Sequence, residues 1–320
     1  MRLRPATRLR AGDEPSTAAV TQFVNQYREQ FGVEPICEVL EFPTSTYYAA
    51  RKRAEQPSAR AADDEKMVVE IRRVWKASGK RYGARKVYAQ LRREGIAVAR
   101  CTVERLMRRL GMSGLVVRRR RPRTTIPSQA GGRPRDLVDR DFRAPAPNQL
   151  WVTDLTYVAL ADGRFVYTAL VTDAFSRAIV GWQVADSLHT DLALDALEMA
   201  LWARQDTLSA ALVHHGDRGV QYTAIRYAQR LTEAGIAQSV GRKGDSYDNA
   251  LAESVNALYK KEAIDQHHPL GDIRDVIRVT AEWIYWYNHE RLHSWCDYRP
   301  PLEYEQVFWQ DRPAQPPTAA

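Results

Sequence analysis

The spacing of apolar residues along this chain changes near residue 148. Before that point, apolar side chains recur three and four positions apart, as on one face of a helix, and Met67, Ile71, Val74 and Trp75 form such a stripe. Beyond it, short apolar runs rich in β-branched and aromatic residues indicate strands that alternate with helical stretches. The pattern therefore predicts a helical first part followed by an α/β part.

The helical first part divides into two sets. The first set comprises predicted helices at residues 18–30, 33–40 and from 43 to the basic run Arg51, Lys52 and Arg53. A polar linker at 54–64 precedes the second set, which contains RYGARKVYAQLRREG and VARCTVERLMRRLGMSG. Helices joined by turns and followed by basic residues outline a DNA-reading helix-turn-helix unit. A plain three-helix bundle with a solvated basic face remains an alternative for the first set.

The α/β part starts with three strands in succession. Strands are predicted at residues 150–159, 164–173, 178–184, 211–214 and 236–240, and helices at 190–203, 221–234, 248–264 and 273–288. Asp162 and Gly163 form a hairpin signal between the first two strands. The aromatic residues of the last helix, Trp283, Tyr285, Trp286 and Tyr287, are expected in its core more than in a nucleic-acid interface.

These elements predict six segments. They are a disordered start (1–16), a helix-turn-helix-like unit (17–60), a second such unit (61–115), a basic linker (116–147), an α/β core (148–265) and a C-terminal helical extension (266–320).

Charge separates the two parts more sharply than the total net charge of +8 suggests. Residues 1–143 hold 32 Lys and Arg against 16 Asp and Glu, whereas residues 144–320 hold 15 against 23. A basic block of this kind attracts phosphates in a salt-sensitive, sequence-independent way. The residues expected to contact DNA are Tyr47, Arg51, Lys52, Arg85, Lys86, Arg100, Arg105, Arg118, Arg119, Arg120, Arg121, Asn249 and Lys260.

Composition also limits the zinc sites and the cellular location that are expected. Cys37, Cys101 and Cys296 are far apart, which indicates reduced thiols, and the lack of any histidine before His189 excludes an amino-terminal His–Cys zinc domain. No apolar run reaches the length of a membrane span or forms a signal peptide. A cytoplasmic, nucleoid-associated location is therefore expected.

Three separated acids carry the candidate chemistry. Asp154 lies inside the first apolar strand, Asp217 follows the fourth, and Glu253 lies on a helix whose face it shares with Asn249, Asn256 and Lys260. A carboxylate in a buried strand is costly unless a cation or metal pairs with it, and ligands of α/β sheets bind at the carboxyl ends of strands. Three acids suit hard divalent cations such as Mg²⁺.

Four motifs in order reveal a family resemblance over most of the chain beyond residue 60. PNQLWVTDLTYV, HHGDRGVQY, SVGRKGDSYDNALAES and YNHERLHSWCDYRPPLEY resemble the second-frame protein of the IS3 insertion-sequence family, with the integrase core of DDE transposases and retroviral integrases. The resemblance implies an α/β, ribonuclease H-like core with a mixed five-stranded sheet, preceded by all-α helix-turn-helix DNA-binding units. Gly216 departs from the family, in which serine is more usual before the second acid.

The resemblance also implies a function, which is DNA transposition by metal-dependent cleavage at element ends and 3′-hydroxyl strand transfer. Asp154, Asp217 and Glu253 map onto the family's metal ligands, and Lys260 onto its basic residue seven positions after the glutamate. Two Mg²⁺ or Mn²⁺ ions are implied as cofactors. The implied partners are double-stranded DNA, comprising terminal inverted repeats and target, further copies of the chain on that DNA, and the upstream-frame product of the same element.

Three alternatives remain. The same fold could serve a structure-specific nuclease that cuts without joining, or a DNA-binding regulator with an inactive core. His289-Glu290-Arg291-Leu292-His293 also matches HExxH, in which two histidines one helical turn apart bind zinc. The irregular, proline-bearing residues after it and the lack of an obvious third ligand favour a chance match.

Overall fold

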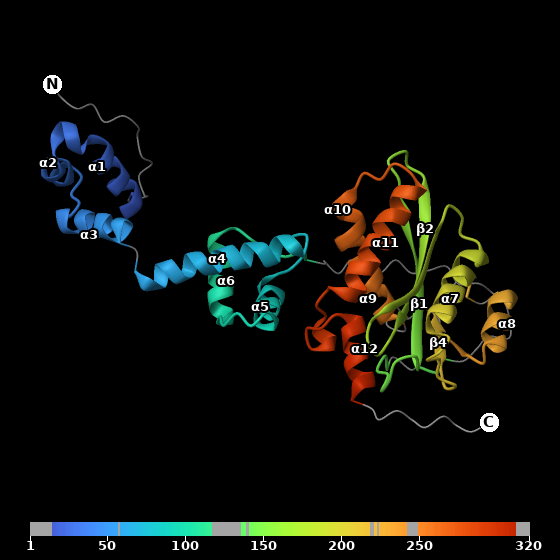
Figure 1. The fold of residues 1–320 in the computed structure, drawn as a ribbon. Helices are drawn as coiled ribbons and strands as arrows, with labels where there is room; N and C mark the ends of the chain where they lie inside the picture. Colours follow the sequence, from blue (N-terminus) through green and yellow to red (C-terminus); the bar gives the residue numbers. More distant parts are fainter. Residues whose placement is uncertain are drawn as a thin grey trace. The chain divides into compact units, whose positions relative to one another are not determined.

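A computed structural model describes residues 15–56, 58–116, 136–138, 141–217, 221–222, 224–241 and 249–311. The chain forms two compact units, residues 1–72 and 73–320. Figure 1 shows their helices and strands. The expected basic residues Arg118, Arg119, Arg120 and Arg121 lie outside the described ranges.

The first unit contains a small three-helix core. Its helices are α1 (Thr17–Phe31), α2 (Val33–Val39) and α3 (Thr44–Glu55). Ser16 caps α1 by accepting a hydrogen bond from the Ala19 amide at 3.3 Å, as serine commonly does at this position. Val24 and Tyr47 are fully buried between the helices. The three predicted helices are confirmed.

The second helical set is longer than the sequence pattern indicated. Its helices are α4 (Ala59–Ala77), α5 (Ala84–Arg93) and α6 (Arg100–Arg109). The prediction of a linker at 54–64 is wrong over its second half, because α4 already begins at Ala59. Ala59, Ala61 and Ala62 are good helix formers, and their propensity outweighs the polarity of this stretch.

The strands of the second unit form one mixed five-stranded sheet. Its strands are β1 (Leu150–Ala159), β2 (Phe165–Asp173), β3 (Ile179–Ala185), β4 (Val213–Gly216) and β5 (Ala237–Val240). The order is β3-β2-β1-β4-β5, with β1 antiparallel to β2 and parallel to β4. The predicted sheet with a central first strand is confirmed. Gly163 has φ +85°, as the tight turn between β1 and β2 requires.

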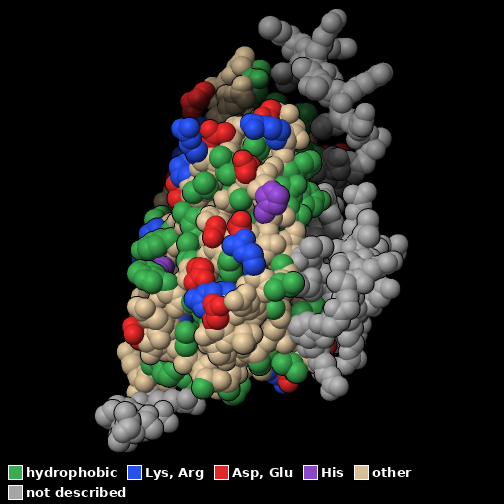
Figure 2. All heavy atoms as spheres, turned by 90° about the vertical axis from the view of Figure 1, so that its right-hand side faces the viewer, with side chains coloured by type: hydrophobic (Ala, Val, Ile, Leu, Met, Phe, Trp, Pro, Cys, Tyr) green, Lys and Arg blue, Asp and Glu red, His purple; other side chains and the backbone are tan. Residues whose placement is uncertain are grey.

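Helices cover both faces of this sheet (Figure 1). On one face lie α7 (Thr190–Arg204) and α8 (Ile225–Glu233), which share a hydrophobic core with Trp151 and Val171 of the sheet. Gly181 of β3 permits the close approach of α7, because a Cβ there would lie only 2.1 Å from the Ala196 carbonyl oxygen. Basic and acidic side chains are interspersed over this side of the molecule (Figure 2).

The opposite face carries the helices that follow β5. They are α9 (Ala250–Tyr259), a π-helical turn η1 (Lys260–Ile264), α10 (Asp265–His267), α11 (Ile273–His289), the 3₁₀ turn η2 (Ser294–Cys296) and α12 (Pro301–Gln310). The prediction of one continuous helix over 248–264 is therefore wrong at its end, where the backbone changes to π-helical bonding. Trp283 and Tyr287 are buried, as predicted, but Tyr285 is 62% exposed.

The segment between α4 and α5 docks onto these C-terminal helices within the second unit. The side chain of Arg81 donates to the Glu262 carbonyl oxygen at 2.9 Å, and the Tyr82 hydroxyl accepts from the Leu292 amide at 2.8 Å. Beneath them, Arg291 makes two hydrogen bonds to the carboxylate of Glu262, at 2.7 and 2.8 Å, with both side chains almost fully buried. None of the helices in the described ranges is long and apolar enough to cross a membrane.

Candidate active site

Asp154 lies on the central strand, where polar groups of α9 hold its carboxylate. One oxygen accepts from the Leu155 amide at 2.9 Å and the other from the Asn256 side-chain amide at 2.8 Å. Burial and the nearby charges of Asp217 and Glu253 raise the pKa of Asp154 to about 8. The carboxylate therefore lacks a compensating cation among its described neighbours.

The shortness of β4 opens the sheet beside Asp154. β4 pairs with β1 only at Leu150, Trp151 and Val152. Beyond Val152, the edge of β1 facing β4 has no strand partner in the described structure, and Asp154 is the second residue of this free edge. Asp217 follows the last residue of β4 directly, so β1 and β4 bring the two acids to the same end of the sheet.

Gly216 explains the local packing before Asp217. A Cβ at this position would lie 3.2 Å from side-chain atoms of both Thr153 and Tyr222. Those two side chains are themselves hydrogen-bonded, at 3.2 Å. Glycine therefore lets Tyr222 pack against the sheet, and the departure from the more usual serine leaves Asp217 in place.

Glu253 supplies the third acid from α9. Its side chain is exposed, and partial burial together with the charge of Asp217 raises its pKa. The charge of Asp217 thus raises the pKa of both Asp154 and Glu253, which come from β1 and α9. Within the described ranges, no three His, Cys, Asp or Glu side chains are already close enough to hold a metal ion. A bound cation would offset the repulsion between these carboxylates and allow them to approach one another.

Two asparagines of the same helical stripe line this site. The Asn249 amide donates to the Thr153 carbonyl oxygen at 3.0 Å, as the Asn256 amide does to Asp154. The Oδ1 atoms of both asparagines are buried without a hydrogen-bond partner in the described part of the chain. Buried acceptors of this kind are costly unless water, a ligand or a hydrated ion pairs with them. The donor set, carboxylates with amide oxygens beside them, thus fits a hydrated Mg²⁺ or Mn²⁺.

Lys260 follows α9 and reaches back to β1. Its ammonium lies 4.2 Å from the ring centroid of Tyr157, which is three residues beyond Asp154 on the free edge. The next residue, Lys261, instead pairs with Asp265 at 3.1 Å. The two neighbouring lysines therefore have different surroundings, and only Lys260 contacts the strand that carries Asp154.

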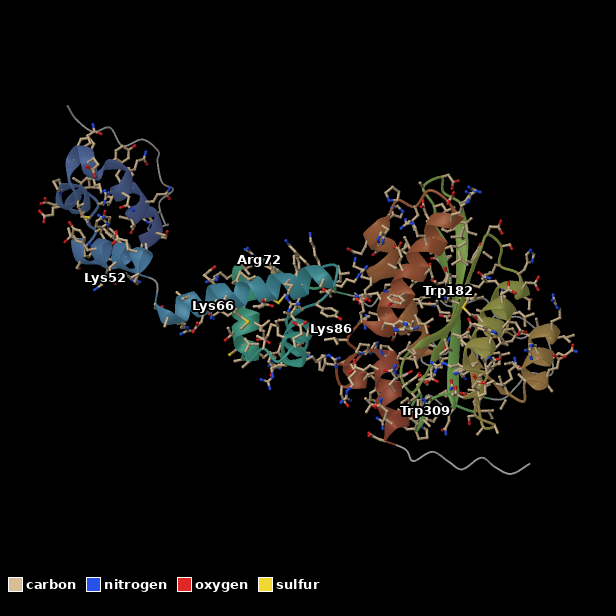
Figure 3. All side chains as sticks on the ribbon, viewed as in Figure 1. Lys52, Lys66, Arg72, Lys86, Trp182 and Trp309 are labelled. Atoms are coloured by element: carbon tan, nitrogen blue, oxygen red, sulfur yellow. The ribbon has the colours of Figure 1, made fainter. Side chains whose placement is uncertain are left out.

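Three of the residues predicted to bind DNA are covered by tertiary packing, fully or in part. Tyr47 is fully buried and donates to Asn25 Oδ1 at 2.8 Å, so it is a core residue of the first unit. Asn249 is buried and donates to the Thr153 carbonyl oxygen, so it ties the start of α9 to the strand that carries Asp154. Lys86, labelled in Figure 3, lies 5.2 Å over the ring of Tyr82, and burial lowers its pKa to about 7. The prediction for Tyr47 is wrong because the core of the first unit covers its ring, whereas Asn249 and Lys86 stay predictions.

The other basic candidates that the structure describes remain on helix surfaces. Lys52 is exposed on α3 (Figure 3), and Arg85 is exposed on α5. Arg51 pairs with Glu55 at 2.8 Å, and Arg100 with Glu104 at 3.1 Å, both one helical turn away on their own helices. Arg105 on α6 is partly buried. These five residues stay predictions for DNA contact.

The HExxH match does not form a zinc site. α11 ends at His289, so the two histidines do not lie one turn apart on a helix. His293 is instead hydrogen-bonded to the Tyr287 hydroxyl at 3.0 Å, and burial lowers its pKa well below the ordinary value. Arg291, between the histidines, pairs with Glu262. The motif therefore stabilises the fold. The sequence analysis did not predict the ion pair between Arg291 and Glu262, because the two residues are 29 positions apart in the chain.

Three family models match the chain. An integrase core domain matches residues 144–246, an HTH-like domain matches residues 61–122, and a second integrase core domain model matches residues 234–301. The first model includes Asp154 and Asp217, and the third includes Glu253 and Lys260.

Similar proteins cover nearly the whole chain. A protein of insertion sequence element IS986/IS6110 from Mycobacterium tuberculosis is 51% identical over 271 residues, which is 84% of this chain and 96% of the relative. The transposase for IS629 from Shigella sonnei is 47% identical over 290 residues, which is 89% of this chain and 95% of the relative. Transposase InsF for IS3A from Escherichia coli K12 is 32% identical and covers 88% of this chain and 97% of the relative.

Solved structures resemble the chain more distantly. The catalytic core domain of HTLV-2 integrase in complex with magnesium has a TM-score of 0.40 and 15% identity, and the match covers 51% of this chain and 99% of that chain. A simian T-cell lymphotropic virus intasome in complex with PP2A regulatory subunit B56 gamma has a TM-score of 0.43 and 14% identity, and covers 75% of this chain and 74% of that chain.

Proposed function

The chain belongs to the IS3 family of integrase-core insertion-sequence transposases, and we propose that Asp154, Asp217 and Glu253 are the residues that carry its phosphoryl-transfer chemistry. The observation that carries the proposal is the mutual electrostatic effect of these acids at one end of the sheet. A transposase of this class cleaves phosphodiesters at the ends of its element and joins the freed 3′-hydroxyl to another strand.

The three acids would hold two divalent cations, Mg²⁺ or Mn²⁺. Three carboxylates together suit hard cations, and the raised pKa of Asp154 indicates a site that gains free energy when a cation binds. Two such ions, when bound, activate the attacking oxygen and stabilise the leaving oxygen of a phosphodiester.

The neighbouring side chains would position the acids and the substrate. Asn256 fixes the orientation of the Asp154 carboxylate through their 2.8 Å hydrogen bond, and Asn249 ties the start of α9 to β1 through Thr153. Lys260 would hold the phosphate of the terminal nucleotide, because its ammonium contacts Tyr157 of β1, the strand that carries Asp154. Fixed positive charge near a transferring phosphoryl group stabilises the charge that develops on it.

DNA affinity would come mainly from the first part of the chain. Residues 17–143 comprise both helical sets and the basic linker, and the excess of Lys and Arg in residues 1–143 supports this role. The DNA partners are then the terminal inverted repeats and the target, with further copies of this chain assembled on them in the cytoplasm, at the nucleoid. The upstream-frame product of the same element would be a further partner.

Conservative substitutions test the three acids. Asp154→Asn, Asp217→Asn and Glu253→Gln should each abolish cleavage and joining of labelled element ends in Mg²⁺, while DNA binding stays measurable in a gel-shift assay. Asp162→Asn, which removes an exposed carboxylate from the β1–β2 turn, serves as the matched control and should retain activity. Retained cleavage in any one of the three variants would remove that acid from the site.

A further inference from the structure

An exposed aromatic pair lies on the β1–β2 hairpin, next to Lys260. Tyr157 on β1 is 55% exposed and Phe165 on β2 is 48% exposed. Their ring centroids are 5.5 Å apart and the rings are nearly perpendicular, at 86°. The Lys260 ammonium lies 4.2 Å from the centroid of the Tyr157 ring. We call Tyr157, Phe165 and Lys260 the aromatic platform.

The surrounding fold does not account for this exposure. Phe165 is the only exposed position of β2, and the other side chains of that strand are buried or partly buried. In the strand register, Tyr157 pairs with Tyr167 and Phe165 pairs with Ala159, so the two exposed rings touch diagonally across the hairpin. Large aromatic side chains left in water beside a charged group often mark a ligand contact.

The position of the platform relates it to the proposed site. Tyr157 is three residues beyond Asp154 along β1, about 10 Å at the usual rise per strand residue, and this odd spacing directs the two side chains to opposite faces of the sheet. Lys260, which follows α9 on the face of Asp154, connects the two positions, because its ammonium lies over the Tyr157 ring. By axial rise, that distance corresponds to about three nucleotides of one DNA strand. A strand whose phosphodiester lies at Asp154 can therefore reach the platform with a nearby nucleotide if it passes Lys260 and the edge of β1 that β4 leaves unpaired in the described structure.

The chemistry of the platform suits a single nucleotide. In a perpendicular ring pair, the edge of one ring meets the face of the other, so the pair itself occupies one of four ring faces. The Lys260 ammonium occupies a second, on Tyr157. About half of the Tyr157 side chain is exposed, and a nucleobase stacks on such an exposed ring whatever its sequence. The ammonium beside the rings matches the charge of the nucleotide's phosphate.

We propose that the aromatic platform holds one unpaired nucleotide of the bound DNA strand, with its base stacked on Tyr157 and its phosphate at Lys260. This inference rests on the proposed function, because the strand must enter the site at Asp154. The base is one that has left the duplex near the reacting phosphodiester, since stacking on a protein ring requires that it leave its neighbours. The platform thereby positions the strand without reading its sequence.

Fluorescence of a base analogue tests the platform without turnover. The full chain is mixed in EDTA with DNA ends that carry 2-aminopurine at one of the last three positions, with that position unpaired. We expect one position to change its emission on binding and Tyr157→Leu to remove that change. The variant should also bind these ends about 5- to 100-fold more weakly, the usual effect of losing one stacked base. Tyr157→Phe, which keeps the ring, should behave as the wild type.

Tyr285 provides a matched control. It is 62% exposed on α11 and stacks on His289 at 4.6 Å, so Tyr285→Leu removes an equally exposed, paired tyrosine. This variant should leave emission and affinity unchanged. Emission that does not change at any position in the wild type, or that persists in Tyr157→Leu, overturns the platform. Neither readout needs cleavage, so a failure here is distinct from retained cleavage in the acid variants, which would overturn the proposed function.

Discussion

Glu262→Gln tests whether the buried ion pair holds the second helical set onto the catalytic part of the chain. The side chains of Glu262 and Arg291 are only 6% and 5% exposed. The carboxylate accepts two hydrogen bonds from Arg291, and its opposite charge keeps the pKa of Arg291 raised despite burial. A glutamine amide removes the charge and turns one acceptor into a donor facing the guanidinium.

The expected loss of stability is large because Arg291 stays buried without a counter-charge. Removing one partner of a buried pair costs about 3–5 kcal/mol. With a urea m-value of about 3 kcal/mol/M or somewhat more, the unfolding midpoint falls by roughly 1 M. Tryptophan emission measures this transition in the full chain, because all eight tryptophans lie in residues 73–320.

Glu282→Gln is the control for this measurement. Glu282 pairs with Arg278 on α11, and both side chains are more than half exposed. Exposed pairs contribute at most about 1 kcal/mol, so the midpoint should move by less than about 0.3 M. If Glu262→Gln shifts the midpoint no further than Glu282→Gln, the buried pair does not stabilise the unit as argued.

Three further predictions concern DNA and pH. Lys260→Ala should reduce end cleavage and joining far more than Lys261→Ala, because only Lys260 contacts β1, and equal effects in a strand-transfer assay would contradict its role. Deleting residues 17–143 should remove most DNA affinity, and binding by the full chain should weaken steeply with salt in a filter-binding titration, unless residues 144–320 bind equally well alone. Burial lowers the pKa of Lys86 from 10.5 to about 7, so its charge destabilises the folded state below pH 7 and this cost fades as the pH rises toward about 10.5. Lys86→Met should therefore raise the urea midpoint at pH 6 and change it little at pH 10, and an effect independent of pH would refute this reasoning.

Local pattern predicted the strands because their signals are contained in a few residues. β1 begins and ends where its apolar run does, and the Asp162-Gly163 turn places β2 beside it. The family motifs supplied the three acids and Lys260, which the fold brings to one end of the sheet. The sequence of α9 and η1 offered no sign of the change to π-helical bonding at Lys260, because the residues of that turn are ordinary helix formers.

Long-range contacts account for the positions that local pattern misplaced. Lys86 follows the polar stripe of α5, but Arg291, whose charge lowers the pKa of Lys86 in addition to burial, lies some two hundred positions later in the chain. Tyr47 precedes basic residues that suggested a DNA-facing helix, yet the core formed with Val24 covers its ring. The sequence analysis did not predict the aromatic platform, because β1 and β2 both have the pattern of apolar strands. That the short β4 leaves an edge of β1 without a strand partner is seen only in the described structure.

Strand transfer by the full chain tests the central claim most directly. Labelled element ends and a supercoiled target are incubated with Mg²⁺, and the products are resolved on a denaturing gel. The account predicts joined products with the wild type that vanish in EDTA and in Glu253→Gln. Cut ends that are never joined would instead indicate a structure-specific nuclease, and bound but uncut ends in Mg²⁺ would indicate a DNA-binding regulator with an inactive core.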